Sequence, residues 1–383
     1  MDKVAVFIKK YSIGKSSPIL CLLDLLSDNY EVDLFLQEAW HMNATVFEKD
    51  TIKLITVEGR KENNSIKIIK NIWDFLFGKN YKNITTIDYN RNYKSYICFD
   101  PHGFFLCKEL FPRSMPFYYS LELYLKNDHF NLEYPEEVMK KEKDEINTIK
   151  GLIIQSQERE HLFRKEYNLS DSVPALILPV TYMQSSVKDK SSLLRGKYDI
   201  DKNKKIALHL GGIQEYFSCI ELALTFSKLE NWVLIFHGCH YGEYIRKLKN
   251  TIKKNGIKNV YISDEFCERI EDMDAILMSC DVGIAWYNNV SLNFSTAGKS
   301  SGKISAYLKF GLPVIAKRYH STIEAIEDTG CGVCVESFDE IGDAISQIEN
   351  NYNQYSKNAL DEFDRTYRFE NYMKEIIDFI ERP

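Results

Sequence analysis

The chain has 383 residues, of which 44% are hydrophobic and 27% are charged, and its formal net charge is −6. This length exceeds what one hydrophobic core usually supports and favours two domains, and the composition is typical of globular proteins. The acidic balance argues against nucleic acid as a partner, and no stretch approaches the roughly 20 apolar residues that span a bilayer. Nine irregularly spaced cysteines favour reduced, buried thiols and a cytoplasmic protein.

Short apolar runs alternate with helical patterns in the first half of the chain, which is typical of βαβ units and parallel sheets. We expect strands at 4–8, 32–36, 53–57, 96–99, 115–119, 152–154 and 175–178. Helices are expected between them at 16–28, 65–77, 102–110, 135–149 and 157–167. These elements predict an N-terminal Rossmann-like domain over 1–182, followed by a polar linker rich in Ser and Lys at 183–192.

The alternation restarts in the second half. Strands are expected at 206–210, 233–236, 260–262, 282–285, 314–316 and 332–335. Helices are expected near 219–229, 241–255, 271–279, 301–310, 321–328 and 338–350. We assign 193–365 to a second Rossmann-like domain and 366–383 to a terminal helix, for which packing back on the first domain is one arrangement. Two such domains form a cleft, and ligands bind at the carboxyl ends of their strands.

The stretch "SSGKISAYLKFGLPVIAKRYHS", which begins at Ser300, suits a phosphate site. Ser300 or Ser301 is a good N-cap, and Gly302 allows a ligand to approach the backbone closely. Free N–H groups of the first helical turn, together with Lys303, would bind a phosphate. The alternative is a serine-capped helix with a solvated lysine.

Loops after three other strands are expected at the carboxyl edges of the two predicted sheets. Gly211 and Gly212 follow the first strand of the second domain, and their backbone N–H groups would face a donor phosphate. His237 follows the next strand and is a candidate donor contact, with an ordinary loop histidine as the alternative. Gly14 follows the first strand of the chain and would face the cleft, unless its loop is a plain turn.

The order "LHLGGI … WVLIFHG … LMSCDVGIAWY … SSGKISAYLKFGLPVIA … TGCGVCV" resembles the donor-binding domain of GT-B glycosyltransferases. It is most similar to the large retaining class that includes many bacterial cell-surface polysaccharide enzymes. The resemblance covers about 204–362, and the pattern from Lys303 to Ile315 is its more specific part. It implies an α/β GT-B fold, in which two Rossmann-like domains with parallel sheets face a central cleft. It also implies a nucleotide sugar whose diphosphate lies on the helix that begins near Ser301.

The sequence departs from that class at two places. The class commonly carries two glutamates eight positions apart, and the second contacts the donor ribose. The matching positions here are Gly298 and Ala306. The class also places basic residues after the first Gly loop, whereas "GGIQEYFSCIELALTF" has none, so Lys303 and backbone N–H groups would neutralise the diphosphate.

Candidate catalytic residues come from two loops of the first domain. Asp100 and His102 follow one strand in "CFDPHGF", and Glu122 follows the next strand. Glycosyl transfer needs a base or carboxylate near the anomeric carbon, which favours Glu122 first and His102 second. Asp100 as a helix N-cap and His102 as a first-turn residue are the alternatives. Glu122 lies between apolar neighbours, so we expect a buried carboxylate that needs a partner or a ligand.

The resemblance implies a metal-independent hexosyltransferase, in which helix dipoles and lysines do the work of a divalent ion. It would move a sugar from a nucleotide-diphosphate sugar, its co-substrate, to a saccharide or lipid-linked acceptor in bacterial surface glycan synthesis, without another cofactor. The alternatives are a catalytically silent GT-B subunit that binds a partner enzyme and a GT-B sugar-nucleotide epimerase. The basic, aromatic segment 65–83 suits either peripheral contact with the inner face of the membrane or a crossover helix.

Overall fold

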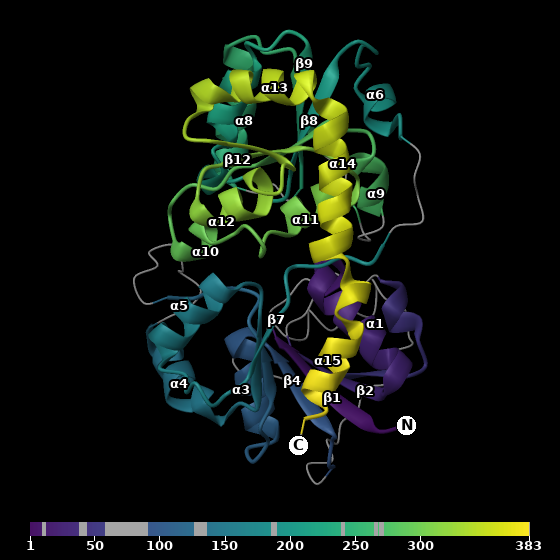
Figure 1. Cartoon of the computed structure of the whole chain (residues 1–383), viewed down its shortest axis with the longest axis vertical. Helices are drawn as coiled ribbons and strands as arrows, with labels where there is room; N and C mark the ends of the chain where they lie inside the picture. Colours follow the sequence, from purple (N-terminus) through teal and green to yellow (C-terminus); the bar gives the residue numbers. More distant parts are fainter. Residues whose placement is uncertain are drawn as a thin grey trace.

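The computed structural model describes residues 1–9, 13–37, 44–57, 91–125, 136–184, 190–238, 242–263, 267 and 272–382. They form two α/β lobes stacked along the long axis of the molecule (Figure 1). The helix expected at 65–77, the segment 65–83 and the middle of the linker at 183–192 lie outside the described residues. No helix within the described ranges is long and apolar enough to cross a membrane.

The N-terminal lobe is built on a parallel sheet with strand order β3-β2-β1-β4-β5-β6-β7. Its strands are β1 Lys3–Lys9, β2 Glu31–Gln37, β3 Ile52–Thr56, β4 Ser95–Phe99, β5 Phe117–Tyr119, β6 Gly151–Ile154 and β7 Ala175–Ile177. Its helices include α1 Ser17–Asn29, α3 Asp100–Leu110, α4 Glu136–Glu145 and α5 Gln157–Tyr167. Side chains of β1 alternate between two hydrophobic clusters, one on each face of the sheet, as expected for a strand covered on both sides.

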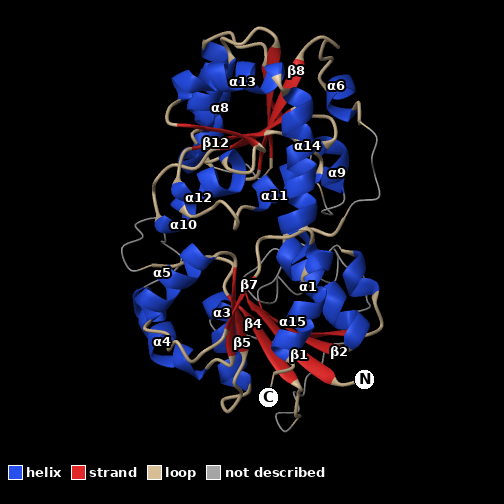
Figure 2. Cartoon of the chain, viewed as in Figure 1, coloured by secondary structure: helices blue, strands red, loops and turns tan. Residues whose placement is uncertain are grey.

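The C-terminal lobe contains a second parallel sheet with strand order β10-β9-β8-β11-β12-β13. Its strands are β8 Lys205–Leu210, β9 Trp232–His237, β10 Val260–Ser263, β11 Val282–Ala285, β12 Val314–Lys317 and β13 Gly332–Val335. The helices around it are α6 Leu193–Lys197, α7 Cys219–Phe226, α8 Glu243–Lys254, α9 Asp272–Leu277, α10 Leu292–Ser295, α11 Gly302–Lys309, α12 His320–Thr322 and α13 Ile341–Asn350. Figure 2 shows that helices flank both sheets, and the predicted pair of parallel α/β sheets is confirmed.

The C-terminal end of the chain returns to the first lobe. Helix α14 (Tyr352–Glu362), which the sequence analysis did not predict, runs down the C-terminal lobe toward α15 (Met373–Ile380) on the N-terminal lobe (Figure 1). At the crossing, Tyr182 N donates to Tyr367 O at 3.0 Å and Phe369 N donates to Tyr182 O at 3.0 Å. The apolar face of α15 joins the core beneath α1. Two segments of the chain, one around Tyr182 and one around Tyr367, therefore connect the lobes and lie side by side.

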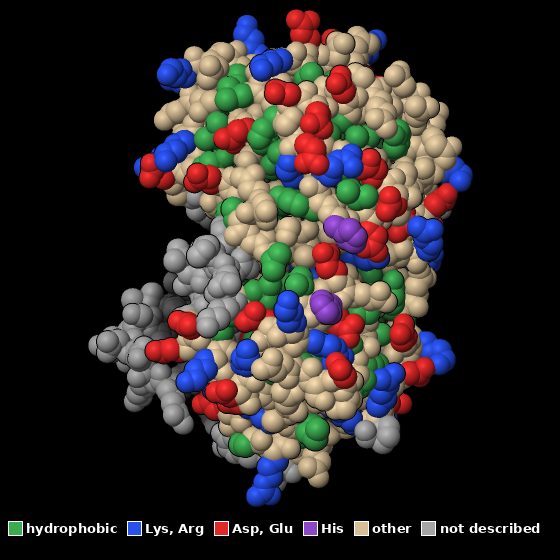
Figure 3. Space-filling model, turned by 60° about the vertical axis from the view of Figure 1, so that its left-hand side comes forward, with side chains coloured by type: hydrophobic (Ala, Val, Ile, Leu, Met, Phe, Trp, Pro, Cys, Tyr) green, Lys and Arg blue, Asp and Glu red, His purple; other side chains and the backbone are tan. Residues whose placement is uncertain are grey.

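The face shown in Figure 3 carries Lys, Arg, Asp and Glu side chains interspersed over both lobes. The described part of this face has no broad patch of one sign.

Candidate active site

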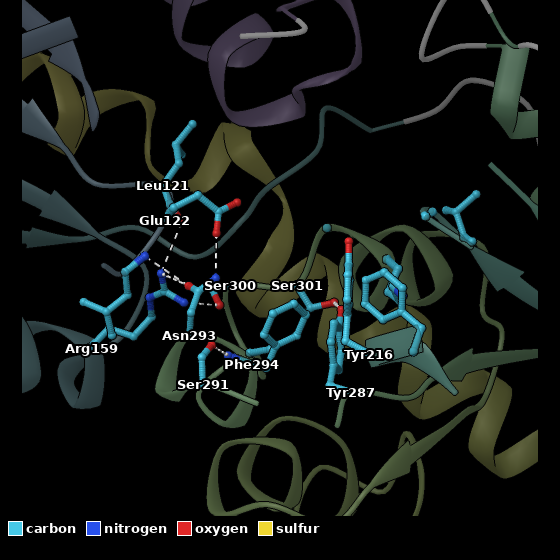
Figure 4. Close-up of a pocket in the computed structure, with 18 of the residues that line it drawn as sticks. Leu121, Glu122, Arg159, Tyr216, Tyr287, Ser291, Asn293, Phe294, Ser300 and Ser301 are labelled. Carbon is cyan, nitrogen blue, oxygen red and sulfur yellow. Dashed lines mark hydrogen bonds between the residues drawn. The ribbon is translucent and has the colours of Figure 1, made fainter. Parts of the chain in front are cut away.

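A cavity of about 810 Å³ lies between the two lobes. It is bordered by segments that follow β5, β6, β8 and β11, so the carboxyl ends of strands from both sheets face it. Its lining comprises Leu121, Glu122, Leu123, Tyr124, Arg159, Tyr182, Leu210, Gly211, Gly212, Tyr216, Phe217, Tyr287, Ser291, Asn293, Phe294, Ala297, Ser300, Ser301, Gly302 and Lys303. Figure 4 shows a polar network on one side of the cavity and aromatic rings on the other.

The N-terminus of α11 opens into this cavity. Ser301 is the N-cap, and its hydroxyl accepts a hydrogen bond from Ile304 N at 3.3 Å and is bonded to the Tyr287 hydroxyl. The helix is anchored by the buried Tyr307 hydroxyl, which accepts from Leu210 N at 2.8 Å and donates to Leu208 O at 2.9 Å. The Tyr307 bonds hold α11 against the end of β8, and the free N–H groups of the first turn of α11 favour an anion.

Lys303 supplies a positive charge at the same place. Its buried Nζ has no hydrogen-bond partner and lies 4.0 Å from the Phe217 ring centroid and 4.8 Å from that of Tyr287. Burial lowers the pKa of Lys303 to about 7. Since a buried ammonium without a hydrogen-bond acceptor is costly, this side chain is arranged to receive an anionic ligand.

The Gly loop opposite Lys303 is shaped by a close contact between two backbones. Gly211 has φ +110° and donates its N–H to His237 O at 2.9 Å. A Cβ on Gly238, which has φ +150°, would lie 1.9 Å from Gly211 O. Glycine is therefore required at 238, and the loop brings Gly211 and Gly212 to the cavity as predicted.

The two histidines at these strand ends lie behind the cavity wall. Nδ1 of His237 is 3.0 Å from Ser263 Oγ and its Nε2 is 3.4 Å from Cys267 Sγ, and His237 does not line the cavity. His209 Nε2 contacts Gly212 O at 3.1 Å, which requires the hydrogen on Nε2. Burial, followed by the charge of Lys303, lowers the pKa of His209 well below its usual value, so a neutral His209 supports the Gly loop.

Glu122 lies across the cavity from α11. The expectation that its carboxylate is buried is wrong, because the loop after β5 turns the side chain outward into the cleft. Its Oε2 accepts a hydrogen bond from Asn293 Nδ2 at 2.7 Å. The polar partner anticipated for this residue is thus an amide from the other lobe.

Asp100 holds the loop that carries Glu122. It is 4% exposed, and its Oδ1 accepts from Leu121 N at 2.7 Å and from Glu122 N at 3.1 Å. Phe99, and not Asp100, occupies the N-cap position of α3. Burial, followed by the charge of Glu122, raises the pKa of Asp100 well above its usual value. Asp100 therefore supports the backbone of the loop that carries Glu122 and does not line the cavity.

Two other predicted residues lie away from the cavity lining. His102 is partly buried in the first turn of α3, and Gly14 is buried in the short turn Ile13–Lys15. Ser300, in contrast, lines the cavity and accepts a hydrogen bond from Arg159 Nη1 at 2.8 Å.

Sequence reasoning missed Arg159, Asn293 and the aromatic wall formed by Tyr216, Phe217, Tyr287 and Phe294. Arg159 is 1% exposed although it lies in the polar stretch "SQEREHLF", whose pattern does not distinguish it from surface residues. Rings of the aromatic wall pack with centroid separations between 4.5 and 5.9 Å. The "EYF" that follows the Gly loop contains two of these four rings and was a local signal for this wall.

The positions of the missing glutamates are closed to carboxylates. A Cβ on Gly298 would lie 2.0 Å from Ser321 O, and Gly298 N donates to Ser321 Oγ at 3.2 Å. Ala306 is 1% exposed and packs in the hydrophobic core of the C-terminal lobe. Any ribose contact must therefore come from other residues. Within the described ranges, no three His, Cys, Asp or Glu side chains are grouped to hold a metal ion.

Residues 266–379 match the family model described as "Glucosyltransferase 3-like, C-terminal domain". The sequence matches no curated protein closely enough to be called a relative. Among solved structures, the chain is similar to HepE of Anabaena in complex with UDP and glucose (14% identity, 99% of both chains covered, TM-score 0.71). It is also similar to sucrose-phosphate synthase of Thermosynechococcus elongatus (11% identity, 99% of this chain and 98% of that chain covered, TM-score 0.69).

A third similar structure is WaaG, a glycosyltransferase involved in lipopolysaccharide biosynthesis (13% identity, 99% of both chains covered, TM-score 0.65). These likenesses span both lobes, and the family model covers the region that contains α11 and two residues of the aromatic wall, Tyr287 and Phe294. The chain therefore has the GT-B glycosyltransferase fold, with a C-terminal lobe similar to that of the glucosyltransferase 3-like proteins.

Proposed function

We propose that the protein transfers a sugar from a nucleotide-diphosphate sugar to a saccharide or lipid-linked acceptor on the cytoplasmic side of the membrane. The observation that carries this proposal is the buried Lys303 ammonium, which has no hydrogen-bond partner at the N-terminus of α11. The structures of HepE with UDP-glucose and with UDP make UDP-glucose the first donor to test.

The donor diphosphate is proposed to lie against Ser301, Gly302 and Lys303, with the N–H groups of Gly211 and Gly212 facing it. In the transfer step, the acceptor hydroxyl oxygen bonds to the anomeric carbon. The bond from that carbon to the diphosphate oxygen breaks, and its electron pair leaves with the diphosphate. The hydroxyl proton passes to the Glu122 carboxylate. Lys303 and the helix dipole stabilise the negative charge that develops, without a requirement for a metal ion.

The test is a calorimetric titration with UDP, GDP and CDP, followed by a donor-hydrolysis screen across nucleotide sugars. We expect one diphosphate to bind, Lys303→Ala to lose that binding, and Glu122→Gln to retain binding but lose about 100-fold or more in kcat. Binding that is unchanged in Lys303→Ala would overturn the assignment of the donor site.

Two other outcomes would redirect the function. A folded protein that binds none of the nucleotides would favour the silent GT-B subunit, and interconversion of two sugar nucleotides without an acceptor would favour the epimerase. Transfer that survives in the presence of a chelator is the outcome expected of the metal-independent enzyme.

A further inference from the structure

Asn293, on the short helix α10 of the C-terminal lobe, contacts three groups of the N-terminal lobe. Its Nδ2 donates to Glu122 Oε2 at 2.7 Å. Its Oδ1 accepts from Leu123 N at 3.0 Å and from Arg159 Nη2 at 2.9 Å. Two donors on one side and a carboxylate on the other fix which end of the amide carries oxygen (Figure 4).

Arg159 strengthens the same connection between the lobes. Its Nη1 donates to Ser300 Oγ at 2.8 Å, and Ser300 immediately precedes the N-cap of α11. Its Nη2 also donates to Leu121 O at 3.2 Å. Because the guanidinium is planar and 1% exposed, it holds the loop of Glu122 and the Asn293 amide in one fixed arrangement.

We propose that Asn293 is a positioning residue that aligns the Glu122 carboxylate for reaction, and that it does so only while the two lobes are closed. The Asn293 amide holds one oxygen of the carboxylate in place and leaves the other to accept a proton. Asp100 fixes the backbone of this loop from within its own lobe, whereas Asn293 fixes the side chain from the other lobe. Separation of the lobes therefore breaks the alignment of Glu122, and hydrolysis or transfer is confined to the closed state.

This inference rests on the proposed role of Glu122 as the proton acceptor. The discriminating variant is Asn293→Asp, which keeps an oxygen for Leu123 N and Arg159 but replaces the donor to Glu122 by a second oxygen. Two carboxylates would then meet at the 2.7 Å contact, and like charges raise the pKa of one of them. We expect the acidic limb of the kcat–pH profile to move upward by about one pH unit or more, which a purely structural role would not produce.

Asn293→Ala tests the coupling directly. We expect kcat to fall by about 10- to 100-fold with a donor KM changed by less than about threefold, because the lost contact acts on the reacting carboxylate and not on the diphosphate. The same change made in Glu122→Gln should cause little further loss, so the two effects should be far from additive. Leu292→Ala is the matched control, since Leu292 is 46% exposed on the same helix and lies outside the cavity lining.

Small-angle X-ray scattering with saturating UDP supplies a readout besides activity. Asn293→Ala, whose fold is checked by circular dichroism, should show a larger radius of gyration than the unsubstituted protein. If Glu122→Gln retains full kcat, the proposed function of Glu122 fails. If Glu122→Gln loses kcat but both Asn293 variants keep the kcat, the pH profile and the closed state, the inference about Asn293 alone is overturned.

Discussion

Replacement of Lys303 by methionine is expected to stabilise the fold while it removes nucleotide binding. The ordinary lysine pKa is 10.5, and burial lowers that of Lys303 to about 7. At about 1.4 kcal/mol for each pKa unit, the folded state loses about 5 kcal/mol by holding the ammonium in its charged form. Attraction to the rings of Phe217 and Tyr287, at 4.0 and 4.8 Å, favours the charged form, but the lowered pKa shows that a net cost remains.

Methionine preserves the length of the side chain and packs well against aromatic rings. We therefore expect Lys303→Met to raise the free energy of unfolding by up to about 5 kcal/mol at pH 6–7. The pH dependence gives the sign independently. Between pH 7 and 10.5 the unfolded lysine binds a proton that the folded one has released, so the stability of the unsubstituted protein should rise with pH in this window. The variant should lack that rise.

The measurement is the melting temperature by calorimetry at pH 6, 7.5 and 9, with Lys309→Met as the control on the same helix. Lys309 lies 3.4 Å from Asp274 Oδ1, so its loss should bring no gain. A lower melting temperature for Lys303→Met at pH 6, or an unchanged pH dependence, would refute the reasoning. Calorimetric titration with UDP should show affinity reduced by about 10-fold or more, the range expected for loss of a hydrogen bond to a charged group.

Three further predictions follow from the site. UDP binding should take up close to one proton at pH 8, because a bound diphosphate restores the charge of Lys303. Calorimetry in buffers of different ionisation enthalpy measures this uptake, and binding without proton exchange would contradict the prediction. The pKa of Asp100 is raised in the folded state, so above about pH 4 the folded protein binds more protons than the unfolded one and becomes less stable as the pH rises. Asp100→Asn should not show this decrease, because asparagine does not titrate and tolerates the φ of +53° at this position. Gly298→Ala should lower the melting temperature markedly, by a clash with the Ser321 carbonyl, whereas Gly196→Ala, which meets nothing within 4 Å, should have little effect.

Much of the fold could be predicted from the sequence, because each buried parallel strand is a short apolar run with a recognisable end. The strands at 282–285 and 332–335 and the helix at 157–167 have the predicted bounds. Helix α14 was missed, since its exposed, polar sequence "YNQYSKNALDE" carries little hydrophobic periodicity. Its stability comes from contact with α11 and the core around Ala359, which only the tertiary structure shows.

The donor side of the cavity was more predictable than the catalytic side. A glycine loop, a serine cap and Lys303 carry their chemistry in local sequence order, and the structure brings them together. Asn293 and Arg159 act across the gap between the lobes, over sequence separations of 171 and 141 residues. No local pattern encodes such a contact. The partner of Glu122 comes from the other lobe, so its apolar sequence neighbours led to the wrong expectation of a buried carboxylate.

Burial lowers the pKa of Lys303, and no carboxylate at 298 or 306 counteracts it. A glutamate beside an ammonium would hold it charged in the empty site and would compete with the diphosphate. Here the first position is closed by Ser321 and the second faces the core, so the compensating negative charge must come with the ligand. Without a bound anion the folded protein bears the cost of desolvation of Lys303, and the donor diphosphate offsets this cost on binding. At the same UDP concentration, UDP should therefore raise the free energy of unfolding more in the unsubstituted protein than in Lys303→Met, because the variant binds UDP more weakly. The destabilising burial of Lys303 is in this way linked to the affinity for the donor.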